Sequence, residues 1–100
     1  MAKQQGALRD RTREFTNFPK NYKVIFHNDD FTTMQFVVEL LVTVFFKTER
    51  EATAIMLEVH EQGRGVVGIY SYDMALTLVK KGIDMARAWG FPLRITYEPE

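Results

Sequence analysis

Three short runs of β-branched, aromatic and apolar residues predict three β-strands. The first covers residues 22–27 and ends at a cluster of turn formers, residues 28–30. The second covers residues 65–70, and its two glycines make a regular strand less favourable there. The third, residues 93–98, alternates apolar and polar side chains with a period of two. That period indicates a strand with one face exposed to water.

Two helices are expected between the first two strands. Thr32 with Gln35 fits a capping box, and the apolar residues behind it recur at helical spacing to about residue 46. Thr48 with Glu51 fits a second capping box at the start of the next helix. Because so few residues separate the two helices, they must form a hairpin or an angled pair.

A third helix is expected between the second and third strands. Ser71 can cap its start, and Gly90 and Pro92 end it. The resulting order is β-α-α-β-α-β, which predicts one compact α+β domain over residues 20–100, with a three-stranded antiparallel sheet packed against three helices. Residues 1–19 are polar, mixed in charge and aperiodic, so we expect a disordered N-terminal arm there.

The composition excludes several classes of function. The 13 basic and 13 acidic residues balance, so no broad field attracts a nucleic-acid backbone or an anionic membrane. With no cysteine, the chain has neither a disulfide framework nor a thiolate metal site. It has no apolar run long enough to span a membrane and no secretory signal, so a cytoplasmic protein is expected.

Three motifs stand in order and at consistent spacing along the folded part of the chain. They are YKVIFHNDDFT at residues 22–32, MLEVHEQG at 56–63 and FPL at 91–93. Each alone is weak, but together they resemble the ClpS family of Clp protease adaptors over residues 22–98. The resemblance implies an N-end rule adaptor that binds substrate proteins through a free N-terminal Leu, Phe, Tyr or Trp. It would deliver them to a ClpA-like or ClpC-like AAA+ unfoldase.

The same resemblance implies a binding site and no catalytic residue, metal or cofactor. It places Asn28, Asp29 and His60 around the substrate's ammonium group, with Asp30 as a further candidate. The residues that would line or border the apolar side-chain pocket are Thr32, Met34, Val37, Met56, Val59 and Leu93.

Asp73, at the start of the third expected helix, would belong to the surface that docks the unfoldase. Many relatives carry Glu and Lys where this chain has Leu76 and Leu78 in that region. Another departure is Thr33, where the family commonly has proline. The identity of the unfoldase therefore stays open.

Each site residue also has an ordinary structural explanation. Acidic residues after a strand commonly form a turn and favour the dipole of the following helix. Asp30 could have that role alone. The two methionines are typical core fillers, the other pocket residues could be plain core, and His60 could be a structural histidine.

Three other functions are weaker hypotheses. His60 with Asp29 or Asp30 could form a catalytic base and its partner, but no nucleophile signature accompanies them. His27 and His60 give no metal-ligand spacing. A protein-interaction domain of the same fold that binds no chain terminus is the main alternative.

Overall fold

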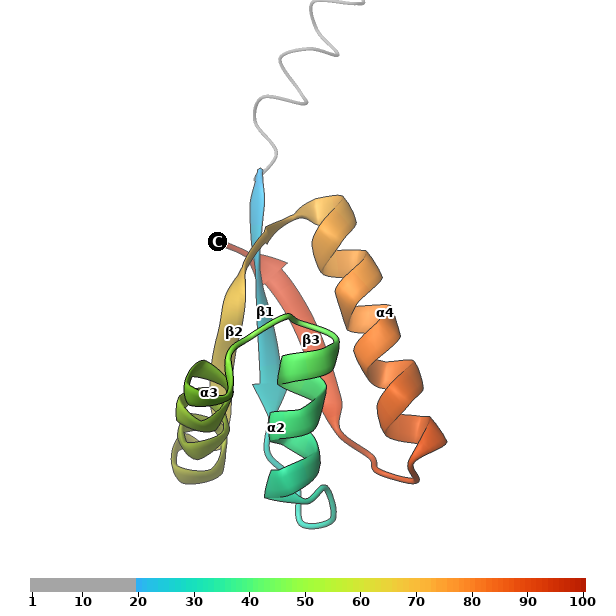
Figure 1. Ribbon diagram of the computed structural model, residues 1–100. Helices are drawn as coiled ribbons and strands as arrows, with labels where there is room; N and C mark the ends of the chain where they lie inside the picture. The colour runs from blue at the N-terminus through green and yellow to red at the C-terminus, as the bar shows by residue number, and fades with distance from the viewer. Residues whose placement is uncertain (1–19) are drawn as a thin grey trace, which may run out of the picture.

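The computed structural model describes residues 20–100, and the arm expected over residues 1–19 lies outside them. The expected order of elements and the antiparallel sheet are confirmed (Figure 1). The elements are β1 (Asn21–His27), α2 (Met34–Thr43), α3 (Glu49–Gln62), β2 (Arg64–Ser71), α4 (Tyr72–Ala88) and β3 (Arg94–Pro99).

The central strand of the sheet is β1, which pairs antiparallel with both neighbours in the order β2-β1-β3. The glycine-containing strand β2 is irregular, as expected. Val24 pairs with Gly68 and Ile25 pairs with Val66, so Val67 is an extra residue that forms a β-bulge. Because β1 is the central strand, its apolar residues occupy the most buried place in the sheet.

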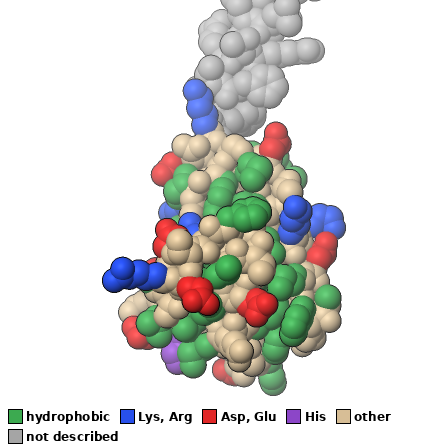
Figure 2. Space-filling model, viewed as in Figure 1, with side chains coloured by type: hydrophobic (Ala, Val, Ile, Leu, Met, Phe, Trp, Pro, Cys, Tyr) green, Lys and Arg blue, Asp and Glu red, His purple; other side chains and the backbone are tan. Residues whose placement is uncertain are grey.

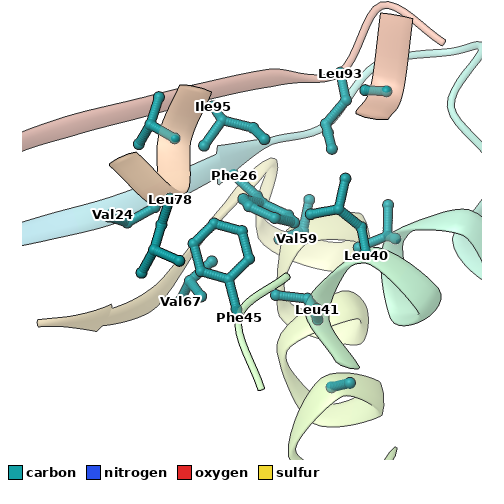
Figure 3. Close-up of a cluster of buried hydrophobic side chains, with 14 of the residues drawn as sticks. Val24, Phe26, Leu40, Leu41, Phe45, Val59, Val67, Leu78, Leu93 and Ile95 are labelled. Atoms are coloured by element: carbon teal, nitrogen blue, oxygen red, sulfur yellow. The ribbon is translucent and has the colours of Figure 1, made fainter. Parts of the chain in front are cut away.

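The three helices cover one face of the sheet, and the core lies between them (Figures 1 and 3). Alternate side chains of β1, Val24 and Phe26, point into this core. On the opposite face, Glu98 lies 3.7 Å from the Lys23 ammonium and 3.4 Å from the Arg64 guanidinium. Ile25 on that opposite face is also buried, at 1% exposure, but it lies outside the core cluster. The side of the sheet that the helices cover is therefore the side that carries the core cluster.

The starts of α3 and α4 agree with the caps predicted from the sequence, and the start of α2 does not. At α3 the Thr48 hydroxyl accepts from the Glu51 amide at 3.1 Å and the Glu51 carboxylate accepts from the Thr48 amide at 2.9 Å, a complete capping box. Ser71 caps α4. The predicted box at Thr32 is wrong, because Thr33 is the cap of α2 and its hydroxyl accepts from the Phe36 amide at 3.1 Å.

The end of α2 also differs from the apolar pattern, which continued to residue 46. The helix ends at Thr43, with Val44 as its C-cap. Phe46 is exposed and has a positive φ of 57°, a conformation uncommon for a bulky side chain. The backbone reversal at Phe46 turns the chain toward α3, so periodicity alone overestimates the length of α2.

The position of the α2 cap leads to a stability prediction. Replacing Thr33 with alanine should lower the free energy of unfolding by about 0.5–2 kcal/mol, because the Phe36 amide loses its acceptor. Replacing Gln35 with alanine should change it by less than about 0.5 kcal/mol, as for an exposed residue outside a cap. Urea denaturation of both variants measures the difference, and a larger loss for Gln35→Ala would restore the box predicted from sequence.

Candidate functional site

Three connections meet at one end of the domain: the β1–α2 turn, the C-terminal end of α3, and the α4–β3 segment (Figure 1). The Asn28 amide donates to the Gly63 carbonyl at 2.9 Å, which ties the turn to the end of α3. Gly63 is the C-cap of α3 and has a φ of 86°, which favours glycine. His60 lies in the last turn of that helix, so this contact brings His60 beside the turn.

A hollow of about 470 Å³ opens at this end of the domain. Its volume is in the range of about 300–1,000 Å³ that is usual for small-ligand sites. The expected ammonium-binding residues Asn28, Asp29 and His60 all line it. The full lining is Asn28, Asp29, Asp30, Phe31, Thr32, Thr33, Met34 and His60.

Asp29 organises the turn that forms one wall of the hollow. One of its carboxylate oxygens accepts from the Phe31 amide at 2.8 Å and from the Thr32 amide at 2.7 Å. The other accepts from the Thr32 hydroxyl at 2.7 Å. Thr32 therefore serves the turn and not the cap of α2.

The environment of Asp29 keeps its carboxyl group ionised. Partial burial acts to raise the pKa of Asp29, but the bonds from Thr32 and Phe31, together with the Arg87 charge, outweigh it and lower that pKa below its ordinary value of 3.8. Three bonds use three of the roughly four lone-pair positions of a carboxylate. One position thus remains for a cationic ligand.

Three other polar side chains of the hollow, unlike those of Thr32 and Thr33, take no part in holding the fold. Asn28, Asp30 and His60 are exposed there, and their side chains make no hydrogen bond or ion pair with another residue in 20–100. An amide oxygen, a neutral imidazole nitrogen and a carboxylate can all accept from an ammonium group. The hollow therefore combines several acceptors with one fixed negative charge.

The remaining pocket candidates lie deeper in the domain. Val37, Val59 and Leu93 are buried in the core cluster, and Met56 packs against it. Figure 3 shows Val59 and Leu93 in this cluster. They face the sheet because they occupy the apolar sides of α2 and α3 and the segment that leads into β3. None of them lines the hollow described above. Their contact with a ligand stays a prediction.

Sequence reasoning left out two residues that line the hollow, Phe31 and Thr33. Phe31 is 75% exposed although it is a large aromatic residue. The signal for Phe31 was local. The Asp29 carboxylate accepts from the Phe31 amide, which forms a turn and places Phe31 within it, away from the core.

Asp73 lies far from the hollow, in the first turn of α4. That turn stands at the opposite end of the domain from the start of α2 (Figure 1). Tyr72, Met74 and Leu76 are exposed beside it. A role of Asp73 in docking stays a prediction.

The described residues offer no metal site and no membrane span. No group of three or more His, Asp or Glu side chains in residues 20–100 could hold a metal ion. His27 is on the sheet, where its Nε2 lies 2.7 Å from the Thr96 hydroxyl, and is not paired with His60. Within the same range, no helix has the length and apolar character needed to cross a bilayer.

Comparisons with known proteins agree with the motifs and the geometry. The family model described as "ATP-dependent Clp protease adaptor protein ClpS" matches residues 17–96. The ClpS adapter of Acetivibrio thermocellus is 56% identical over 82 residues, which are 82% of this chain and 83% of that protein. The ClpS adapter of Lawsonia intracellularis is 45% identical over 95 residues, which are 95% of this chain and 87% of that protein.

A solved structure gives the same result for the fold. The structure of Agrobacterium tumefaciens ClpS2 bound to L-phenylalaninamide matches with a TM-score of 0.79 and 40% identity, and the match covers 83% of this chain and 100% of that one. ClpS is a family of protease adaptors and not of enzymes. The expected resemblance is confirmed, and the chain belongs to the ClpS family of ATP-dependent Clp protease adaptor proteins.

Proposed function

We propose that this adaptor binds proteins whose free N-terminal residue is Leu, Phe, Tyr or Trp and delivers them to a Clp AAA+ unfoldase-protease for degradation. The observation that carries the proposal is the hollow between the β1–α2 turn and the end of α3, which combines unused acceptors with apolar surface. A chain terminus of this kind has a charged ammonium group next to a large apolar side chain. The hollow offers a partner for each.

The ammonium group would lie among Asn28, Asp29 and His60. An ammonium has three donors, and these side chains offer an amide oxygen, a carboxylate oxygen and an imidazole nitrogen. Asp30, exposed on the same turn, adds negative charge without a fixed position. Internal residues of a polypeptide have no ammonium, so this half of the site selects chain ends.

The apolar side chain would contact Met34 and Thr32 at the hollow, with Val37, Met56, Val59 and Leu93 behind them as the inner wall. Burying a Leu or Phe side chain contributes about 1.5–3 kcal/mol. Hydrogen bonds to a charged group contribute about 1.5–3 kcal/mol each. Association costs roughly 4–15 kcal/mol, so neither half of the site is sufficient alone.

The ligand of one relative supports this assignment. Agrobacterium tumefaciens ClpS2 was solved with L-phenylalaninamide. That molecule consists of a free α-amine, a benzyl side chain and a carboxamide, so it is a minimal copy of an N-terminal phenylalanine. A related adaptor with the same fold therefore binds the chemical groups that this hollow suits.

Delivery requires that the adaptor hold its substrate and its unfoldase at the same time. Asp73 and the start of α4 lie at the end of the domain opposite the hollow (Figure 1). A partner docked there leaves the hollow open. This separation supports α4 as the unfoldase-docking element, with either a ClpA-like or a ClpC-like partner.

Acetylation of the substrate's amine tests the function. A peptide that begins with free Phe or Leu should bind at least about tenfold more tightly than its N-acetylated twin, because the twin loses at least one charged hydrogen bond. Isothermal titration calorimetry with the full chain measures both dissociation constants. Recovery of the peptide unchanged separates an adaptor from an enzyme.

Equal affinity for the free and acetylated peptides would contradict recognition of the terminus. The alternative, a protein-interaction domain that ignores the ammonium group, would then account for the fold. A peptide that begins with free Ser serves as the control for the apolar half of the site, and it should bind at least tenfold more weakly than the Phe peptide.

A further inference from the structure

A second concavity, of about 280 Å³, adjoins the hollow along α2. We call it the Trp89 groove, and its lining is Thr33, Gln35, Phe36, Glu39, Trp89 and Phe91. Thr33 lines both concavities, so they are continuous at the start of α2. A ligand that occupies the hollow can therefore extend into the groove without leaving the protein surface.

Three aromatic residues line the groove, and one of them, Trp89, is largely exposed. The Phe36 ring lies 5.9 Å from the Trp89 ring and 4.8 Å from the Phe91 ring, measured between centroids. Phe36 is buried, whereas Trp89, the single tryptophan of the chain, is 62% exposed. An aromatic surface of this size gains free energy when a partner covers it.

The α4–β3 segment that carries Trp89 and Phe91 is held in place. Arg87 donates to the carbonyl oxygens of Phe91 and Leu93, each at 2.9 Å. Trp89 is the C-cap of α4, and its amide donates to the Met85 carbonyl at 3.1 Å. The groove is therefore formed before a ligand arrives, which lowers the entropic cost of binding.

The lining of the groove also includes one acidic side chain, Glu39. Glu39 is exposed on α2, and its carboxylate has no ion-pair partner within residues 20–100. Acidic and hydrophobic side chains are interspersed over this helical face of the molecule (Figure 2). A cation above an indole ring and beside a carboxylate gains from both, since tryptophan is the best aromatic partner for a cation.

We propose that the Trp89 groove binds the third to fifth residues of the substrate and favours a Lys or Arg side chain there, which stacks on Trp89 and pairs with Glu39. This inference rests on the proposed function. An extended chain advances by about 3.3–3.6 Å per residue. Its third and fourth residues thus lie roughly 7–11 Å from the terminus, far enough to pass Thr33 and reach the next turn of α2.

The test compares short and long ligands on the full chain. Calorimetry gives the dissociation constants of Phe-Ala-amide and of the amides Phe-Ala-Ala-Arg-Ala-Ala and Phe-Ala-Ala-Glu-Ala-Ala. The Arg hexapeptide should bind about fivefold more tightly than the dipeptide, from one exposed cation–π contact and one exposed ion pair. Because the chain has one tryptophan, its fluorescence should shift with the Arg hexapeptide and not with the dipeptide.

Two variants locate the effect. Trp89→Ala and Glu39→Gln should each reduce the advantage of the Arg hexapeptide and leave the affinity for the dipeptide unchanged. Leu57→Ala, an exposed apolar truncation on α3 outside both concavities, is the matched control and should change neither value.

The outcomes separate the groove from the hollow. If the dipeptide binds and neither hexapeptide binds more tightly, or if Trp89→Ala weakens all ligands equally, the groove has no role in binding. If the Glu hexapeptide binds as tightly as the Arg hexapeptide, the charge preference is wrong and the proposal fails in that form. If no peptide with a free Phe binds, the proposed function is overturned, and the inference with it.

Discussion

Shortening Leu93 to alanine is expected to lower the free energy of unfolding by about 2–5 kcal/mol. The Leu93 side chain is 1% exposed and lies among Phe26, Leu40 and Val59 in the core (Figure 3). The loss combines the transfer free energy of the removed atoms with the cavity they leave. Urea denaturation followed by circular dichroism measures it, against a total stability of about 5–15 kcal/mol for a domain of this kind.

The result decides what kind of residue Leu93 is. Met34 is the matched control, because it is 48% exposed at the hollow, and Met34→Ala should change stability by less than about 0.5 kcal/mol. If Leu93→Ala retains wild-type stability and yet binds Leu and Phe peptides more weakly, Leu93 is a pocket residue first. If Leu93→Ala loses much stability and the folded variant still binds these peptides with wild-type affinity, Leu93 is a core residue and not part of the pocket.

Local rules predicted the parts of the fold that depend on local contacts. The Thr48–Glu51 box and the Ser71 cap are each formed by residues within one helical turn, so the sequence pattern contained the whole interaction. The start of α2 was predicted one residue too early because two threonines compete there. The Asp29 carboxylate holds the first, Thr32, and leaves the second, Thr33, to cap the helix.

The site could not be derived from local rules, because its parts are far apart in sequence. One backbone bond, from the Asn28 amide to the Gly63 carbonyl, brings the β1–α2 turn against the end of α3. No periodicity or propensity encodes that bond, and only the family resemblance placed Asn28 and His60 together. Phe31 stands inside the first motif of the resemblance but was given no role in the site, and its exposure follows from the geometry of the Asp29 turn.

Replacing Asp29 with asparagine is expected to weaken binding of a free-amine Phe peptide at least about tenfold, which is about 1.4 kcal/mol. Asparagine keeps an oxygen that can accept from the Phe31 and Thr32 amides, so the turn persists while the negative charge is lost. The acetylated peptide has no ammonium, so its weaker binding should not change. Calorimetry on both peptides measures the charge-dependent part directly.

Asp30→Asn is the matched control, because it removes the same charge from the neighbouring residue. Asp30 is exposed and makes no hydrogen bond within residues 20–100, so its loss should weaken the free-amine peptide by no more than about twofold, as for an exposed ion pair. Equal losses in the two variants would mean that Asp29 acts only through net charge. No loss in either would remove both acids from the ammonium site.

The pH dependence of stability tests the same residue without a ligand. The pKa of Asp29 is lower in the folded protein than its ordinary value of 3.8, mainly because its bonds to Thr32 and Phe31 outweigh the effect of burial. A depressed carboxyl pKa stabilises the folded state at pH values above 3.8, and this contribution is lost as the pH falls through the folded pKa. The wild type should therefore be more stable than Asp29→Asn near neutral pH, and the gap should close in acid below pH 3.8. A stability difference that stays constant from neutral pH to strong acid would show that the charge of Asp29 does not stabilise the fold. The charge could then act only on the ligand.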